Sequence, residues 1–156
     1  MSSLQDFAGD ALLHETPDGG ELAMENGLFV HDKYFSSAVY LSLFGGNKND
    51  PGKLKNNKEW WGNTLEGISK SEKLISRFQY IIQGLPMTVK HIREAEIAAQ
   101  LDLQWLIDDE LADEIAVNGR AAGKNEFELE IEIKKNSSII FEHTYSLQWE
   151  LHHGSN

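Results

Sequence analysis

The chain has 156 residues, no cysteine, and 14 Lys plus Arg against 25 Asp plus Glu, which gives a formal net charge of -11. This length fits a single domain with its own core, and 25% charged residues beside 40% hydrophobic ones exclude a compositionally disordered chain. The lack of cysteine excludes disulfides and thiolate chemistry, and the acidic balance disfavours general binding to nucleic acid or to an anionic membrane. The acidic excess suits either a basic protein partner or solubility alone.

The sequence contains no segment that predicts export or membrane insertion. Residues 1–10 lack a basic start and an apolar stretch, so we expect no signal peptide. No apolar run approaches the roughly 18 residues that a membrane span needs. We therefore expect synthesis and folding in a cytoplasm.

Turn signals divide the first 36 residues into short apolar pieces, which predict an irregular N-terminal arm. Pro17-Asp18-Gly19-Gly20 and Asn26-Gly27 are the strongest of these signals. The core is expected to span residues 37–151 of one domain, 1–156. It begins with Ser37 to Phe44, which is apolar on both sides and predicts a central strand covered on both faces.

Residues 45–58 are rich in Gly, Asn and Lys and predict a long loop, and a long loop in a compact domain is often functional. It carries Lys48, Lys53 and Lys55. Trp60 and Trp61 follow, and adjacent residues cannot share one face of a helix or strand, so one is expected in the core and the other exposed or at an interface. The lysines and tryptophans are therefore candidate partner contacts.

Two amphipathic helices are predicted next. The first begins near Ser71 and ends at Gly84-Leu85-Pro86, and Thr88 is placed to cap the second. The short link between them predicts antiparallel neighbours. Asp108-Asp109-Glu110 would interact unfavourably with the helix dipole at a helix C-terminus. Either the second helix stops near Ile107, or, as we favour, a new short turn begins there with these acids at its N-terminus.

The C-terminal third changes to a period of two, which is typical of strands. A short strand through Ile115 and Val117 is expected to end at Asn118-Gly119. The apolar residues from Phe127 to Lys134 alternate with glutamate, and Lys135-Asn136-Ser137 predicts a turn into a long strand, 138–151. The resulting order β-α-α-β-β-β predicts an α+β fold, with an antiparallel or mixed sheet and two antiparallel helices packed on one face.

Patterns typical of catalysis are absent from the sequence. It has no Gly-rich phosphate loop, no G-x-S-x-G and no H-E-x-x-H. His143 is expected in the core or at its rim, and Glu94 and Glu96 on a solvent-facing side of the second helix. We therefore predict no enzymatic activity, no catalytic residue, no metal, no cofactor and no small-molecule substrate.

Glu128, Glu130 and Glu132 form a ladder on one face of the predicted hairpin, with neighbours about 7 Å apart. The ladder is either a solvated face that discourages aggregation or a docking face for a basic partner. Thr144, Ser146 and Gln148 lie on the polar side of the final strand, which is a candidate docking edge.

The sequence resembles the Mu-type phage baseplate wedge and sheath-initiator family, which is related to the T4-type wedge protein once described as a tail lysozyme. The matching features are Gly9-Asp10, the segment Ala38 to Phe44 with its Gly-Asn-Asp loop, Trp60-Trp61-Gly62, Gly67 with Ser69-Lys70, and the Ala95, Ala99, Leu103, Trp105-Leu106 series that leads to Ala116-Val117. Together they extend over nearly the whole chain.

The resemblance implies a structural subunit of a contractile phage or phage-like tail. Such a subunit lies in the virion tail baseplate, assembled in the host cytoplasm, and joins other wedge proteins to the tube-side core proteins. It also implies that the tail sheath subunit docks on a strand edge and so begins sheath assembly. The alternatives are a small muramidase-like tail lysozyme and a regulatory adaptor on the same fold.

Overall fold

The structure is a computed structural model that describes residues 35–46, 63, 65–69 and 73–149, together with short strands of the N-terminal region. The chain divides into two compact units, Met1–Leu41 and Ser42–Asn156. Each unit is described by itself below.

The first unit contains three pairs of short antiparallel strands. β1 (Asp10–Ala11) pairs with β6 (His31–Asp32), β2 (Leu13–Thr16) with β3 (Gly19–Leu22), and β4 (Met24–Glu25) with β5 (Leu28–Phe29). Thr16 of β2 is paired with Gly19 of β3, and Pro17 and Asp18 of the predicted turn lie outside the described residues.

α1 (Ser36–Phe44) is a helix, so the predicted central strand over Ser37 to Phe44 is wrong. A short apolar run on both sides of a segment fits a buried strand and a buried helix equally well. Leu and Ala favour the helix, and the segment has no polar alternation that would hold one face of a strand in solvent. The leading strand of the predicted order is therefore a helix, whose last three residues belong to the second unit.

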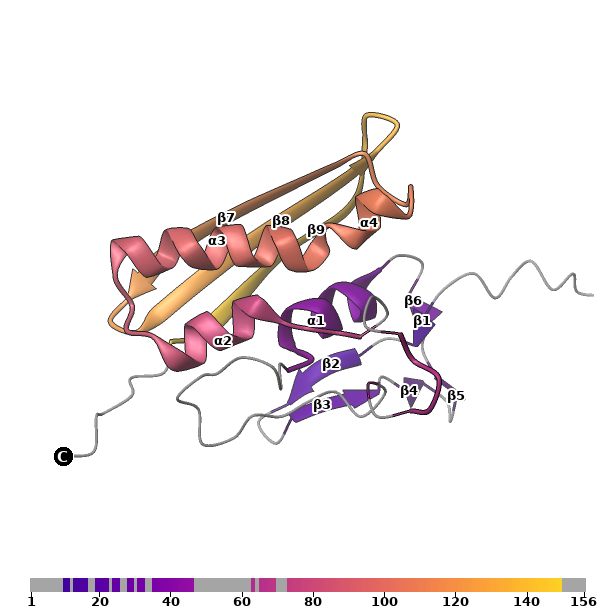
Figure 1. The fold of residues 1–156 in the computed structure, drawn as a ribbon, viewed down its shortest axis with the longest axis horizontal. Coiled ribbons are helices and arrows are strands. Elements are labelled where there is room, and N and C mark those ends of the chain that lie inside the picture. The colour runs from indigo at the N-terminus through magenta and orange to yellow at the C-terminus, as the bar shows by residue number, and fades with distance from the viewer. Residues whose placement is uncertain are drawn as a thin grey trace, which may run out of the picture. The chain divides into compact units, whose positions relative to one another are not determined.

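The second unit is an α+β arrangement, as predicted. α2 (Arg77–Gly84), α3 (Val89–Leu103) and the short α4 (Trp105–Asp108) precede β7 (Glu114–Gly123), β8 (Glu126–Lys135) and β9 (Ser138–Gln148). The three strands form one antiparallel sheet in the order β7-β8-β9. α2 and α3 run along one face of this sheet (Figure 1), and α3 packs against both α2 and β7.

Both predicted helices exist, with one boundary corrected. α2 begins at Arg77 rather than near Ser71. The cap of α3 is confirmed, since the Thr88 side chain accepts a hydrogen bond from the His91 amide at 3.2 Å. The favoured interpretation of the acidic turn is wrong: the short helix after α3 begins at Trp105 and ends at Asp108, so these acids lie at its end.

The sheet confirms the alternation of β8 and corrects its neighbours. Phe127, Leu129, Ile131 and Ile133 are all buried. β7 continues through Asn118-Gly119 to Gly123, so the predicted strand end is wrong. The register of β8 with β9 shifts between Ile133, which is opposite Phe141, and Lys134, which is opposite Ile139. The shift leaves Ile139 on the outer side of the sheet, where it is 52% exposed.

The core lies between the sheet and the helices. Phe127 contacts Phe78 of α2 and Trp149, with ring centroids 6.2 and 5.1 Å apart. The Trp149 indole donates a hydrogen bond to the Leu85 carbonyl at 2.6 Å, which ties the end of the sheet to the end of α2. Burial of this kind contributes about 25 cal/mol per Å² of apolar surface, so these large rings dominate the stability of the unit.

Candidate interaction surface

The sheet face opposite the helices is polar and strongly acidic. Residues two apart on a strand share a face, and the register aligns the outward residues of all three strands. Glutamates on this face are Glu114, Glu126, Glu128, Glu130, Glu132 and Glu142, and its cations are Arg120 and Lys134. The predicted glutamate ladder is therefore the middle row of a wider acidic surface, which we call the acidic face.

Two members of the ladder form ion pairs within the sheet. Arg120 donates from both Nε and Nη2 to the Glu128 carboxylate, and Lys134 Nζ lies 2.8 Å from Glu132 Oε1. The hydrogen bond with Glu132 raises the pKa of Lys134. Among the described residues, no Lys or Arg forms an ion pair with Glu130.

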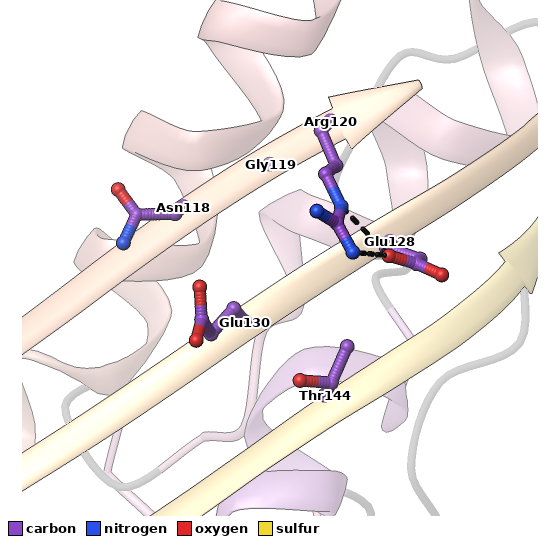
Figure 2. Close-up of a pocket in the computed structure, with 6 residues that line it drawn as sticks. All are labelled: Asn118, Gly119, Arg120, Glu128, Glu130 and Thr144. Carbon is purple, nitrogen blue, oxygen red and sulfur yellow. Dashed lines mark hydrogen bonds and ion pairs between the residues drawn. The ribbon is translucent and has the colours of Figure 1, made fainter. Parts of the chain in front are cut away.

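Glu130 lines a hollow of the acidic face. Asn118 and Thr144 are its register partners on β7 and β9, and Gly119, Arg120 and Glu128 complete the wall (Figure 2). The hollow has a volume of about 150 Å³. Because its lining carries two carboxylates, Glu128 and Glu130, against one guanidinium, Arg120, the hollow suits a cationic hydrogen-bond donor better than an anion.

The outer edge of β9 has main-chain amides that point away from the sheet. The Trp149 amide donates to the Asn125 carbonyl at 2.7 Å, so this pair is of the hydrogen-bonded type. Alternation along an antiparallel ladder then directs the amides of His143 and Tyr145 toward β8, and those of Thr144 and Ser146 away from it. Thr144, Ser146 and Gln148 are exposed, and no described strand pairs with this edge.

The outer edge of β7 differs because a side chain occupies it. The Gly119 amide points away from β8 and donates to Glu96 Oε1 of α3 at 2.8 Å. Glycine is required here, since a Cβ would lie 2.7 Å from Phe127 Cζ. Glu96 was expected to face solvent, and that prediction is wrong: its side chain is 16% exposed and blocks a strand edge.

The turn between β8 and β9 is fixed from outside the hairpin. Asn136 and Ser137 both have positive φ, at 51° and 62°, as a two-residue hairpin turn demands. Asp113 accepts hydrogen bonds from the Asn136 amide at 2.7 Å and from Lys135 Nζ at 3.1 Å. These bonds lower the pKa of Asp113 and hold the hairpin in register.

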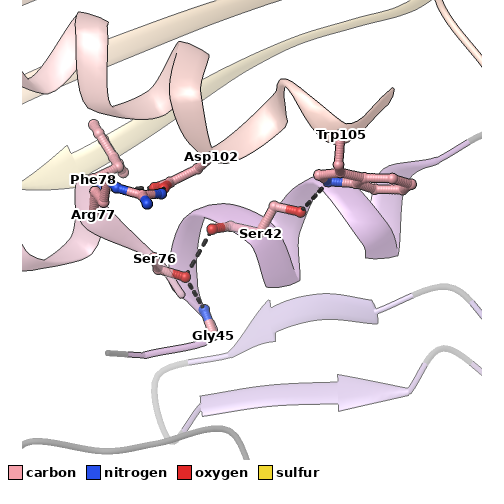
Figure 3. A network of polar contacts seen from close by, with 7 residues as sticks. All are labelled: Ser42, Gly45, Ser76, Arg77, Phe78, Asp102 and Trp105. Carbon is pink, nitrogen blue, oxygen red and sulfur yellow. Dashed lines mark hydrogen bonds and ion pairs between the residues drawn. The ribbon is translucent and has the colours of Figure 1, made fainter. Parts of the chain in front are cut away.

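A buried network behind the sheet ties three helices together (Figure 3). Ser76 Oγ donates to the Ser42 carbonyl at 2.7 Å and accepts from the Gly45 amide at 3.0 Å. The Trp105 indole donates to Ser42 Oγ at 3.0 Å. The end of α1 is thereby joined to the start of α2 and to α4, which makes the support of the sheet rigid.

Asp102 of α3 caps α2 in place of a local residue. Its carboxylate accepts from the Phe78 amide at 2.8 Å and from Arg77 Nη1 at 3.3 Å, and the residue is 7% exposed. Burial raises the pKa of Asp102 to about 6, against the opposing effect of these hydrogen bonds. Since Ser76 is engaged elsewhere, this cap explains why α2 begins at Arg77.

The structure brings together only part of the predicted partner-binding set. Glu128, Glu130, Glu132, Thr144, Ser146 and Gln148 lie on the acidic face and the β9 edge. Lys48, Lys53, Lys55, Trp60 and Trp61 lie outside the described residues. His143, expected in the core or at its rim, is exposed beside Tyr145, with ring centroids 4.5 Å apart.

Arg120, Asn118 and Lys134 were not identified from the sequence as members of this surface. The signal was available, because a β7 strand continued past Gly119 places Arg120 opposite Glu128. The predicted strand ends at Asn118-Gly119 and therefore does not include Arg120, whereas β7 extends to Gly123. Asp102 left no local signal, since its partners lie 24 and 25 residues away.

Within the described ranges, no three or more His, Asp or Glu residues lie close enough together to hold a metal ion. No helix in the same ranges is both long and apolar enough to cross a bilayer. Comparison of the chain with models of protein families, with curated proteins and with solved structures found no match.

Proposed function

We propose that this chain is a structural assembly subunit that docks an extended segment of a partner protein on the outer edge of β9. The observation that carries the proposal is the β9 edge itself, where the amides of Thr144 and Ser146 point outward from an exposed strand. An added strand satisfies such groups with main-chain hydrogen bonds. The blocked Gly119 amide on β7 favours β9 as the edge that accepts it.

The resemblance of the sequence to the Mu-type baseplate wedge and sheath-initiator family is the ground for proposing a contractile tail as the assembly. In that setting the incoming segment belongs to the tail sheath subunit, while other surfaces meet the wedge and tube-side core proteins. The rigid support of the sheet by the Ser76 and Asp102 contacts favours such a role, because a preformed edge loses little entropy on binding.

The test is the binding of a tail sheath subunit from the same phage or prophage to two variants at one position. Thr144→Pro removes an outward amide, and proline is tolerated on an edge strand whose N–H faces solvent. Thr144→Val keeps the amide and the shape of the side chain. We expect Thr144→Pro to weaken binding by about tenfold or more, the loss of roughly one hydrogen bond, and Thr144→Val to bind as the native chain does.

Circular dichroism and thermal unfolding of both variants establish that the sheet is intact. His143→Pro is the internal comparison, because it removes an amide directed toward β8 and is expected to unfold the hairpin. If folded Thr144→Pro binds the sheath subunit with native affinity, the β9 edge is not the docking site and the proposal is wrong.

A further inference from the structure

We infer that the segment docked on β9 carries a lysine or arginine opposite Thr144, and that the cation of this residue occupies the hollow around Glu130. The inference rests on the proposed function and specifies the chemistry of its partner. It is carried by three observations: an open strand edge at Thr144, a Glu130 carboxylate that forms no ion pair with a described residue, and a hollow that Thr144 and Glu130 both line.

The first step is the geometry of an added strand. Its residue opposite Thr144 projects from the acidic face, one strand spacing beyond β9, and Glu130 is one spacing in the other direction. The two positions are therefore about 10 Å apart between backbones. Long cationic side chains cover this separation together with the glutamate side chain, whereas Ser, Thr or Asn does not.

The second step is the charge left by the sheet itself. Glu128 and Glu132 already form ion pairs with Arg120 of β7 and Lys134 of β8, so an incoming cation gains the least electrostatic stabilisation beside them. Glu130 forms no ion pair with a described residue, and its register partners Asn118 and Thr144 are uncharged. A guest ammonium or guanidinium group completes the row of ion pairs across the acidic face.

The third step excludes a second copy of this chain as the favoured occupant. Pairing two β9 edges joins two acidic faces, each with six glutamates and two cations, in a chain of net charge -11. Like charges on adjacent strands are destabilising. The same negative charge that opposes self-association attracts a basic segment, so the surface favours a partner of positive charge.

The experiment uses the whole chain, labelled with ¹⁵N, and three synthetic peptides of one extended sequence. The peptides differ only at the central position, which is lysine, norleucine or glutamate. We expect the lysine peptide to shift the Thr144 and Ser146 amide signals with an affinity about two- to fivefold above that of the norleucine peptide, the usual gain from one exposed ion pair. The glutamate peptide is expected to bind weakest, and the differences in affinity among the three peptides are expected to decrease in high salt.

Glu130→Gln tests the assigned carboxylate, and Glu94→Gln, which removes a partly exposed carboxylate of α3 far from this face in the chain, is its control. Glu130→Gln is expected to abolish the preference for lysine, and Glu94→Gln to keep it. Equal binding of all three peptides at the β9 amides overturns this inference but does not contradict docking on the β9 edge. If no peptide shifts the β9 amides, the edge fails as a strand acceptor, and the proposed function falls with the inference.

Discussion

Replacing Asp102 with asparagine isolates the free energy of burying one charge. The substitution keeps the shape of the side chain and an oxygen that accepts the Phe78 amide, while it removes the ion pair with Arg77. The Asp102 side chain is fully buried, and burial raises the pKa of its carboxyl from 3.8 to about 6.

The direction of the effect follows from proton linkage. The folded chain holds the Asp102 proton more tightly than the unfolded chain, so this group makes the free energy of unfolding fall as the pH rises through 3.8 to about 6. A shift of this size corresponds to about 3 kcal/mol in all, of which about 1 kcal/mol falls between pH 5 and pH 7. The asparagine variant lacks this contribution.

The assay is urea unfolding of the native chain and of Asp102→Asn at pH 5 and pH 7. We expect the free energy of unfolding of the variant, taken relative to that of the native chain, to be about 1 kcal/mol higher at pH 7 than at pH 5. Glu94→Gln, which removes a partly exposed carboxylate from the same helix, controls for the loss of a negative charge. A stability difference between the native chain and Asp102→Asn that is the same at both pH values refutes the account of Asp102 as a buried, desolvated cap.

Three further substitutions test the packing and the surface. Gly119→Ala places a Cβ 2.7 Å from Phe127 Cζ, and we expect a loss of about 1–3 kcal/mol in urea unfolding; native stability contradicts the close contact. Trp149→Phe removes the donor to the Leu85 carbonyl, and thermal unfolding is expected to show a loss of about 1–3 kcal/mol, whereas an unchanged midpoint contradicts that bond. Arg120→Ala is expected to cost less than about 1 kcal/mol, since the side chain is 77% exposed; a loss well above about 1 kcal/mol that does not decrease in high salt contradicts a solvent-screened pair.

The elements that sequence predicted best are those whose pattern has a single physical solution. β8 alternates acidic and apolar residues from Glu126 to Ile133, and only a strand with one buried face satisfies that pattern. The cap of α3 by Thr88 was predictable because it is local, involving the amide three residues further on. Both predictions are confirmed.

The elements that sequence could not decide depend on contacts distant in the chain. α1 is apolar on both sides, and such a run leaves helix and strand equally open until its neighbours are known. The start of α2 is set by Asp102, which lies 24 residues beyond Phe78. The outward direction of the Thr144 amide required the register of β8 with β9, which the sequence alone does not supply.

Hydrogen exchange at the β9 amides tests most directly whether this edge accepts a strand. In the free chain, the amides of Thr144 and Ser146 are expected to exchange fast and that of Tyr145 slowly, because only the last points toward β8. On addition of the tail sheath subunit, Thr144 and Ser146 are expected to become slow while Tyr145 stays slow. Amides of Thr144 and Ser146 that exchange slowly in the free chain, or that remain fast in the complex, contradict docking by strand addition to β9.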